Sequence, residues 1–277
     1  MALLLATVAA CTDEISFDYH TVEPLPVIEG YVEDGGVNVL VTMSRDVTDS
    51  SRNHFVDDAV VSLAGPGGRE YSVPAMGEGR YSLQGVECVT GGVYTLSVSL
   101  GGQTYVASDT MVAEPVDPRG GFVWEEIMET DYVSYRFAAM TPTDRYSDYV
   151  VFIKRNGTPY TWSSFNNYAA YDGLMDGRIL CFSQDDIDRK KDSHPEDVLH
   201  DGDKMEIAIA AVSRRVGDYY EALETGEDTN ANPAWAFSGG KALGVFAARN
   251  VVKLPSVTFS IDGVASDIDL SGTGAED

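Results

Sequence analysis

YTLSVSLGGQTYVASDTMV, residues 94–112, is the clearest structural signal in the chain. Tyr94, Leu96 and Val98 alternate with threonine and serine, which is the two-residue period of a half-buried β-strand. Gly101-Gly102 then supplies a tight turn, because glycine adopts a positive φ at little steric cost. Residues 103–112 return in the opposite direction. The segment therefore predicts a β-hairpin with one face in a hydrophobic core.

The same pattern extends from this hairpin toward the N-terminus. Asp34-Gly35-Gly36 and Gly65-Pro66-Gly67-Gly68 provide turns, and the apolar residues between them alternate. Strands are expected over residues 27–32, 37–43, 59–63, 69–73, 79–83, 94–100 and 103–112. Many short strands with regularly spaced turns are typical of a sandwich. Residues 25–113 are therefore predicted to form an antiparallel β-sandwich, immunoglobulin-like or prealbumin-like.

A second β-rich domain with one or two short helices is predicted over residues 122–262, which makes the chain mainly β. The Pro- and Gly-rich segment 114–121 is expected to break both helix and strand and to separate the two domains. Asn156-Gly157 lies between two strand-like runs and is a strong hairpin signal. Further strands are expected over residues 122–124, 132–139, 148–154, 158–162, 204–212 and 244–248, whereas residues 163–178 are predicted to be a loop.

One amphipathic helix is predicted near residue 220. Its apolar stripe has the spacing i, i+3, i+4 and i+7, formed by Val216, Tyr219, Tyr220 and Leu223. Gly226 is predicted to end this helix. A short surface helix is expected within residues 184–198, and residues 263–277 are predicted to be a flexible tail.

Residues 1–11, MALLLATVAAC, resemble a bacterial lipoprotein signal peptide. The apolar run is too short to span a bilayer but fits the core of a secretory signal. Val8-Ala9-Ala10-Cys11 resembles a lipobox, in which the Cys11 thiol receives diacylglycerol. The acidic tether of residues 12–24 resembles a surface-export signal. We therefore expect outer-membrane lipid anchoring through Cys11, facing the cell surface; a buried first strand or a soluble start with a core cysteine are the alternatives.

The composition is that of an acidic protein with a substantial core. Lys and Arg number 19 against 44 Asp and Glu, which gives a net charge of −25. Such a surface repels phosphate backbones, so nucleic-acid binding is not expected. No segment after residue 11 has 18 consecutive apolar residues. Cys88 and Cys181 have apolar neighbours and are expected to be buried free thiols, with a bridge between them as the alternative.

The order of several short motifs resembles a known family. The motifs are VIEGYV at 27–32, VLVTMSR at 39–45, AVVSL at 59–63, GRY at 79–81, GVYTL at 92–96, DGD at 201–203, YY at 219–220 and GGKALGVF at 239–246. This order is similar to that of the Bacteroidetes outer-membrane lipoproteins of the domain of unknown function DUF4249, which are commonly found alongside TonB-dependent transporters. The resemblance implies such a partner and assigns no catalytic residue. Ser238 stands where the family usually has asparagine.

No catalytic residue, cofactor or metal site is predicted. Ser238 lacks the first glycine of a hydrolase nucleophile turn. His194 and His200 are six residues apart, which is not the spacing of a helical metal pair. The acidic segments 185–188 and 201–203 do not match a calcium-binding loop. We therefore expect no enzyme; a lipid-anchored hydrolase with paired carboxylates is the third possibility.

Aromatic residues at 160–178 form the candidate binding site. Trp162, Phe165, Tyr168 and Tyr171 lie in a stretch with few charges, and interfaces are enriched in aromatic residues. Packing of these rings in the core is the alternative. The leading hypothesis is a surface-anchored, non-enzymatic accessory lipoprotein that partners a TonB-dependent transporter in nutrient capture or uptake. The alternative is a stand-alone lipoprotein that binds a small molecule, glycan or peptide.

Overall fold

The computed structural model describes residues 23–46, 49, 54–140, 147–166, 174–190, 192–194, 197–229 and 233–266. The chain is mainly β, as predicted, and its strands form four sheets that pack in pairs. Within the described ranges, no helix is long and apolar enough to cross a membrane. The predicted lipidation site Cys11 and the binding candidates Tyr168 and Tyr171 lie outside these ranges.

The N-terminal sandwich contains the predicted hairpin. Its first sheet has the order β16-β1-β2-β7-β6, with β3 beside β2, and its second has the order β5-β4-β8-β9. The strands are β1 Pro26–Glu33, β2 Gly36–Met43, β3 His54–Phe55, β4 Val60–Ala64, β5 Glu70–Val73, β6 Ala75–Gly77, β7 Arg80–Gln84, β8 Val93–Leu100, β9 Gln103–Thr110 and β16 Leu243–Ala248. Tyr94, Leu96 and Val98 are fully buried, which confirms their predicted inward face.

Strand β16 comes late in the sequence but lies beside β1, the first strand. It pairs in parallel with β1, from Val27 opposite Leu243 to Val32 opposite Ala248. Gly244 has a φ of 102°, and an added Cβ would lie 2.0 Å from the carbonyl oxygen of Ile28. Glycine is therefore required at this close approach. The N-terminal sandwich includes a strand from the far end of the sequence, a pairing that local periodicity does not reveal.

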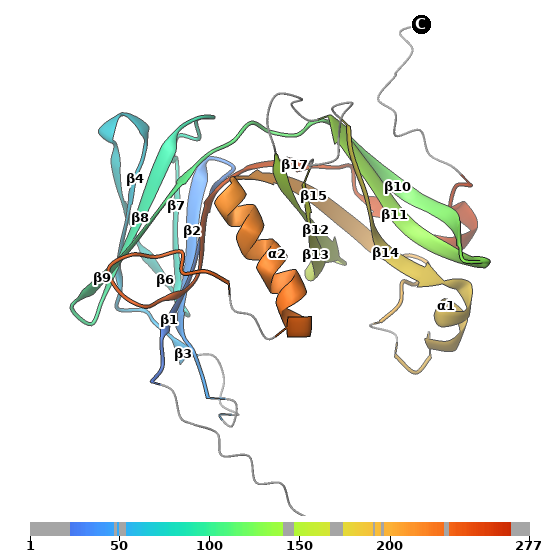
Figure 1. The fold of residues 1–277 in the computed structure, drawn as a ribbon, viewed down its shortest axis with the longest axis horizontal. Helices are drawn as coiled ribbons and strands as arrows, with labels where there is room; N and C mark the ends of the chain where they lie inside the picture. Colours follow the sequence, from blue (N-terminus) through green and yellow to red (C-terminus); the bar gives the residue numbers. More distant parts are fainter. Residues whose placement is uncertain are drawn as a thin grey trace, which may run out of the picture.

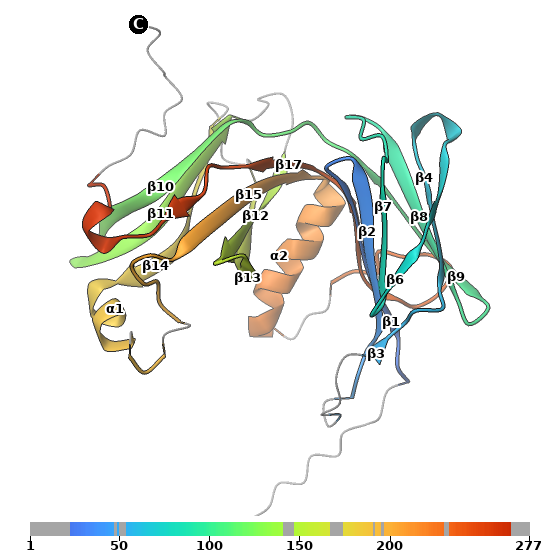
Figure 2. The ribbon, with the colours of Figure 1, turned by 180° about the vertical axis from the view of Figure 1, so that it is seen from behind.

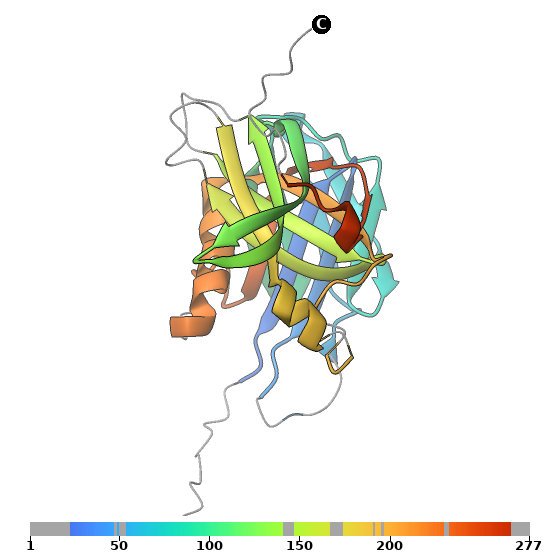
Figure 3. The same ribbon diagram turned by 90° about the vertical axis from the view of Figure 1, so that its right-hand side faces the viewer.

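The C-terminal sandwich packs a three-stranded sheet on a larger one. The first has the order β10-β11-β14 and the second β13-β12-β15-β17, with β18 also beside β15. These strands are β10 Val116–Ile127, β11 Thr130–Met140, β12 Asp148–Arg155, β13 Thr158–Asn166, β14 Leu174–Ser183, β15 Lys204–Val212, β17 Asn250–Lys253 and β18 Val257–Thr258. Figure 3 shows β10, β11 and β14 in front, with the red C-terminal segment along them. Fully buried rings such as Tyr135 and Phe137 fill the space between the two sheets.

The prediction that residues 114–121 break the strand is wrong, because β10 begins at Val116 and continues through Pro118. Strand β10 is an edge strand, where a missing proline N–H is tolerated, and its register shifts between Val116 and Arg119. Gly120 also has a packing reason, since a Cβ there would lie 2.5 Å from the Tyr135 hydroxyl oxygen.

Two helices accompany the sheets, as predicted: α1 Gln184–Lys190 and α2 Arg214–Thr229. Helix α2 lies between the two sandwiches and packs on β12, β13 and β16 (Figures 1 and 2). Val216 and Tyr220 are its buried residues on the predicted stripe. The predicted stop at Gly226 is wrong, because α2 continues to Thr229. A single interior glycine costs only about 1 kcal/mol, so it does not by itself end a helix.

A buried arginine holds the two sandwiches together. Arg249 lies between β16 and β17, and its Nε donates to the Glu33 carboxylate at 2.5 Å. Its guanidinium lies over the Tyr31 ring at 4.1 Å and the Phe152 ring at 4.8 Å, which belong to different sandwiches. Burial would lower the pKa of Arg249, but the nearby Glu33 outweighs it and raises that pKa, so the side chain stays charged.

Candidate functional site

Two of the predicted binding residues, Trp162 and Phe165, lie on strand β13 and not in a loop. The predicted loop 163–178 is wrong in part, because β13 continues to Asn166 and β14 begins at Leu174. Strand β13 pairs with β12 from Arg155 opposite Thr158 to Asp148 opposite Asn166, so hydrogen bonding to β12 extends the strand. The predicted Asn156-Gly157 hairpin turn is confirmed by this pairing and by a positive φ at both residues.

The structure does not bring Trp162 and Phe165 together. The Trp162 ring is half-buried and packs edge-to-face on Tyr220 of α2, with centroids 5.1 Å apart. The Phe165 ring packs on Phe137 at 4.6 Å, inside the C-terminal sandwich. Each ring therefore contributes to a different core, and Trp162 also borders a hollow of the surface.

That hollow, which we call the edge groove, is an open depression of about 660 Å³. It lies between β13 and β14, which are the last strands of the two facing sheets. Its described lining consists of Tyr160, Thr161, Trp162, Ser163, Arg178, Ile179, Leu180, Lys190 and Asp197. The exposed edge of a sheet carries backbone N–H and C=O groups without strand partners, which suits the binding of an extended chain.

Irregular pairing shapes both walls of the edge groove. The β12–β13 register shifts beside Tyr160, between the pairs Ile153–Thr161 and Lys154–Pro159. The β11–β14 register shifts beside Leu180, which has a φ of 56°. A left-handed backbone is unfavourable for a bulky residue such as leucine, and such strain gathers at functional sites. β-Bulges commonly redirect side chains next to binding sites, and here both are at the groove.

The groove presents aromatic rings beside positive charges. Arg155 lies over the Tyr160 ring at 5.4 Å and pairs with the Asp203 carboxylate at 2.6 Å. Burial raises the pKa of Tyr160, with the nearby Arg155 opposing it, so the phenol stays neutral. Lys190 lies 3.9 Å from Asp197 at the rim.

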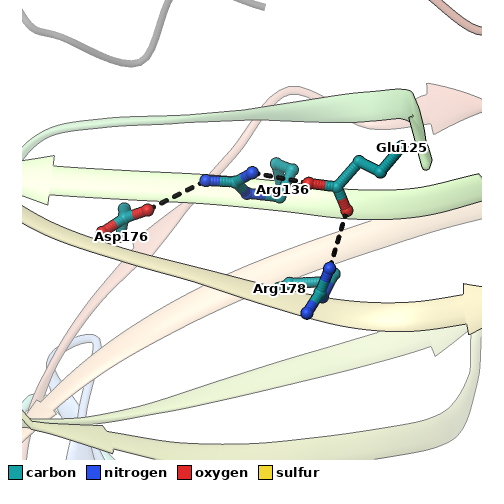
Figure 4. A network of polar contacts seen from close by, with 4 residues as sticks. All are labelled: Glu125, Arg136, Asp176 and Arg178. Atoms are coloured by element: carbon teal, nitrogen blue, oxygen red, sulfur yellow. Dashed lines mark hydrogen bonds and ion pairs between the residues drawn. The ribbon is translucent and has the colours of Figure 1, made fainter. Parts of the chain in front are cut away.

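Arg178 is held by a network on the outer face of the β10-β11-β14 sheet (Figure 4). Arg136 and Arg178 are directly opposite each other, which would be unfavourable for two like charges. The Glu125 carboxylate lies between them, at 2.6 Å from Arg136 and 3.3 Å from Arg178. Asp176 binds the other side of Arg136 at 2.9 Å.

The charge of Glu125 is maintained by these partners. Burial would raise the pKa of Glu125, but hydrogen bonds from Arg136, Ser134 and Arg178 outweigh it and lower that pKa. Among the described residues, Glu125 is also the sole partner of the Arg178 guanidinium, and the Arg178 side chain is 44% exposed. Arg178 also lines the edge groove, and its guanidinium has more N–H donors than the one that Glu125 accepts.

Sequence reasoning missed the contributions of Arg178, Leu180 and Lys190. Residues 174–180 alternate weakly because Gly177 interrupts them, and the stretch therefore does not predict a strand. In the fold, a Cβ on Gly177 would lie 2.5 Å from the Phe137 ring and 2.7 Å from the Phe165 ring. The glycine is thus required by ring packing across the sandwich, and not by a loop.

No group of three or more His, Cys, Asp or Glu side chains that could hold a metal ion is found in the part of the chain that the structure describes. Cys88 carries a free thiol and is half-buried, less than the sequence predicted. The side chain of Cys181 is outside the description. The described lining of the groove consists of aromatic rings, charged side chains and strand edges.

The fold and the groove define a class: a mainly β protein of two packed sandwiches with one long helix between them and an open groove between two strand edges. The chain belongs to the family described as domain of unknown function (DUF4249), whose profile matches residues 12–253. This confirms the resemblance to the DUF4249 family. Comparison with proteins of curated function gives no significant match.

Proposed function

We propose that this protein is a non-enzymatic, lipid-anchored accessory protein of the outer membrane that binds ligand in the edge groove and partners a TonB-dependent transporter. The observation that carries the binding role is the position of Tyr160, Trp162 and Arg178 on two strand edges that have no further strand partner among the described residues. The location is supported by Val8-Ala9-Ala10-Cys11 and the partner by the family resemblance. Nutrient capture or uptake is the proposed role.

The groove favours an extended ligand with anionic groups. The edges of β13 and β14 offer backbone hydrogen bonds, and the aromatic rings offer flat apolar faces. Arg178 and Lys190 exceed Asp197 by one positive charge among the lining residues. A peptide or glycan with carboxylate groups satisfies these features together. A stand-alone binding lipoprotein would use the same groove without a transporter.

Membrane anchoring is tested with Cys11→Ala in cells that lipidate the chain. Without the Cys11 thiol no thioether forms, so the variant is expected to leave the outer-membrane fraction. Two or more acyl chains are needed for stable anchoring, which explains why the loss should be nearly complete. Full retention of Cys11→Ala in the outer membrane would exclude lipid as the anchor.

The partner is tested by affinity purification of the lipidated full chain after crosslinking. Recovery of a TonB-dependent transporter supports the accessory role, while its absence together with ligand retention by the chain alone favours the stand-alone role. The double variant Arg178→Gln/Lys190→Gln tests the groove, with Lys241→Gln as a matched surface lysine away from it. If the wild type, the double variant and Lys241→Gln all recover the same amount of transporter and ligand, the edge groove is not the recognition site.

A further inference from the structure

A second hollow lies on the β13-β12-β15-β17 sheet, away from the edge groove. It has a volume of about 350 Å³, within the range of small-molecule sites. Phe152, Ala208 and Lys253 form one row across three strands, since Ala208 is paired with Phe152 on β12 and with Lys253 on β17. Lys154 and Glu206 form the next row.

The hollow results from a change of strand partner. β15 pairs with β17 at residues 208–211 and with β18 at residues 204–205, and the chain between these two strands leaves the sheet. The Leu254 N–H still donates to the Ile207 carbonyl oxygen at 2.9 Å, after which Pro255 and Ser256 are exposed. The space beside Glu206 is thus left without a neighbouring strand, while Phe152, Ala208 and Leu254 provide apolar surface.

We call this second hollow the lysine hollow, because Lys154, Lys204 and Lys253 line it. Such a concentration of lysine is unusual in so acidic a chain. The sequence has six lysines and a net charge of −25, yet Lys154, Lys204 and Lys253 all line the same hollow. Glu206 lies 3.1 Å from Lys204, and Asp34 lies 2.7 Å from Lys253. Lys154 is exposed and has no ion pair with any residue that the structure describes. Three ammonium groups against two carboxylates leave one positive charge in excess.

We propose that the lysine hollow binds a small monoanionic ligand with an apolar body, an aliphatic or aromatic carboxylic acid. The carboxylate pairs with Lys154, and the apolar body covers Phe152, Ala208 and Leu254. One excess charge matches one carboxylate, and the apolar surface gives a reason for affinity beyond charge. The exposed position of Lys154 makes the charge contribution modest and salt-dependent.

The test is calorimetric titration of the full chain with sodium octanoate, compared with octanol and acetate. Octanol has the alkyl chain without the charge, and acetate has the charge without the chain. We expect octanoate to bind about fivefold more tightly than octanol, the upper range for one exposed ion pair, and at least tenfold more tightly than acetate. Octanol binding as tightly as octanoate, or the absence of octanoate binding, would overturn the proposal.

The variants locate the site. Lys154→Gln is expected to weaken octanoate binding about fivefold, the upper range for one exposed ion pair. Ala208→Met leaves the charges in place and fills the hollow, so it should abolish binding. Lys241→Gln is the matched surface control, and Lys190→Gln tests binding in the edge groove. Unchanged melting temperatures establish that all variants fold, and a loss of affinity with Lys190→Gln but not with Lys154→Gln would refute this location.

Discussion

Replacing Arg249 with methionine should strongly destabilise the protein, because this one side chain contacts both sandwiches. The side chain is 11% exposed, and its partner Glu33 is 24% exposed. Removing one member of a buried pair typically costs about 3–5 kcal/mol, since the other charge is left without a partner. The partial exposure of Glu33 lets water recover some of this cost. The stacking of Arg249 on Tyr31 and Phe152 adds about 0.5–1 kcal/mol for each ring. We therefore expect a loss of about 3 kcal/mol from Arg249→Met.

The assay is urea unfolding at pH 7, followed by tryptophan fluorescence and by circular dichroism. A double-mutant cycle with Glu33→Gln should give a coupling energy of about 2 kcal/mol, because the two groups are in direct contact. Lys253→Met is a matched control: Lys253 also connects the two sandwiches, through Asp34, but its side chain is 70% exposed. That control should cost less than about 1 kcal/mol. If the losses in unfolding free energy of Arg249→Met and Lys253→Met differ by less than about 0.5 kcal/mol, burial of Arg249 does not increase its contribution to stability.

Three further predictions test the described fold. Burial raises the pKa of Asp148 to about 6, although Arg214 opposes it, so the folded chain retains a proton that the unfolded chain releases. The stability of the wild type relative to Asp148→Asn should therefore fall as the pH rises from about 4 to about 6, and a pH-independent difference in urea midpoints would contradict this. Trp162→Ala should cost about 2 kcal/mol because the half-buried ring packs on Tyr220, and an unchanged melting temperature would show that the ring is not part of the core. Gly177→Ala should cost about 1–3 kcal/mol from ring overlap, whereas Gly263→Ala, whose Cβ would meet nothing closer than 3.7 Å, should be nearly neutral in thermal melts.

The strands with clean alternation were predictable from the sequence. Residues 94–98 and 205–209 bury every second residue, so their period of two appears directly in the order of residues. The helix near Tyr220 was predictable for the same reason, with its own period. Its end was not, because a single glycine costs a helix only about 1 kcal/mol and does not by itself end it.

Long-range pairing explains most of what local patterns missed. Strand β16 belongs to the N-terminal sheet because it pairs with β1 across more than 200 residues, and no local period reports that partner. From the sequence alone, Pro118 predicts the end of a strand. Strand β10 tolerates it because β10 lies at the edge of its sheet, where a missing N–H leaves no partner unpaired. The edge groove depends on two bulges, at Tyr160 and Leu180, which are set by the strands opposite them. The sequence identified Trp162 of the groove as a candidate binding residue, but it did not predict that Arg178, Leu180 and Lys190 lie beside it.

The charge distribution suggests that the edge groove and the lysine hollow share a preference for anionic ligands. With a net charge of −25, most of the surface repels anions, and a diffusing anion is directed to the few places of opposite sign. The lining of the edge groove has Arg178 and Lys190 against Asp197, and the lysine hollow has three lysines against Glu206 and Asp34. Counted on the lining residues alone, the excess is one positive charge in the edge groove and two in the lysine hollow, and Glu125 and Asp34 partly offset it as the partners of Arg178 and Lys253. Arg178 and the three lysines of the hollow are on strands, whereas Lys190 is the last residue of α1. Because these charges are exposed, their attraction is screened over about 8 Å at physiological salt. In the proposed roles, repulsion elsewhere on the surface disfavours non-specific anion binding, and short-range contacts with rings and strand edges would determine which anion is retained.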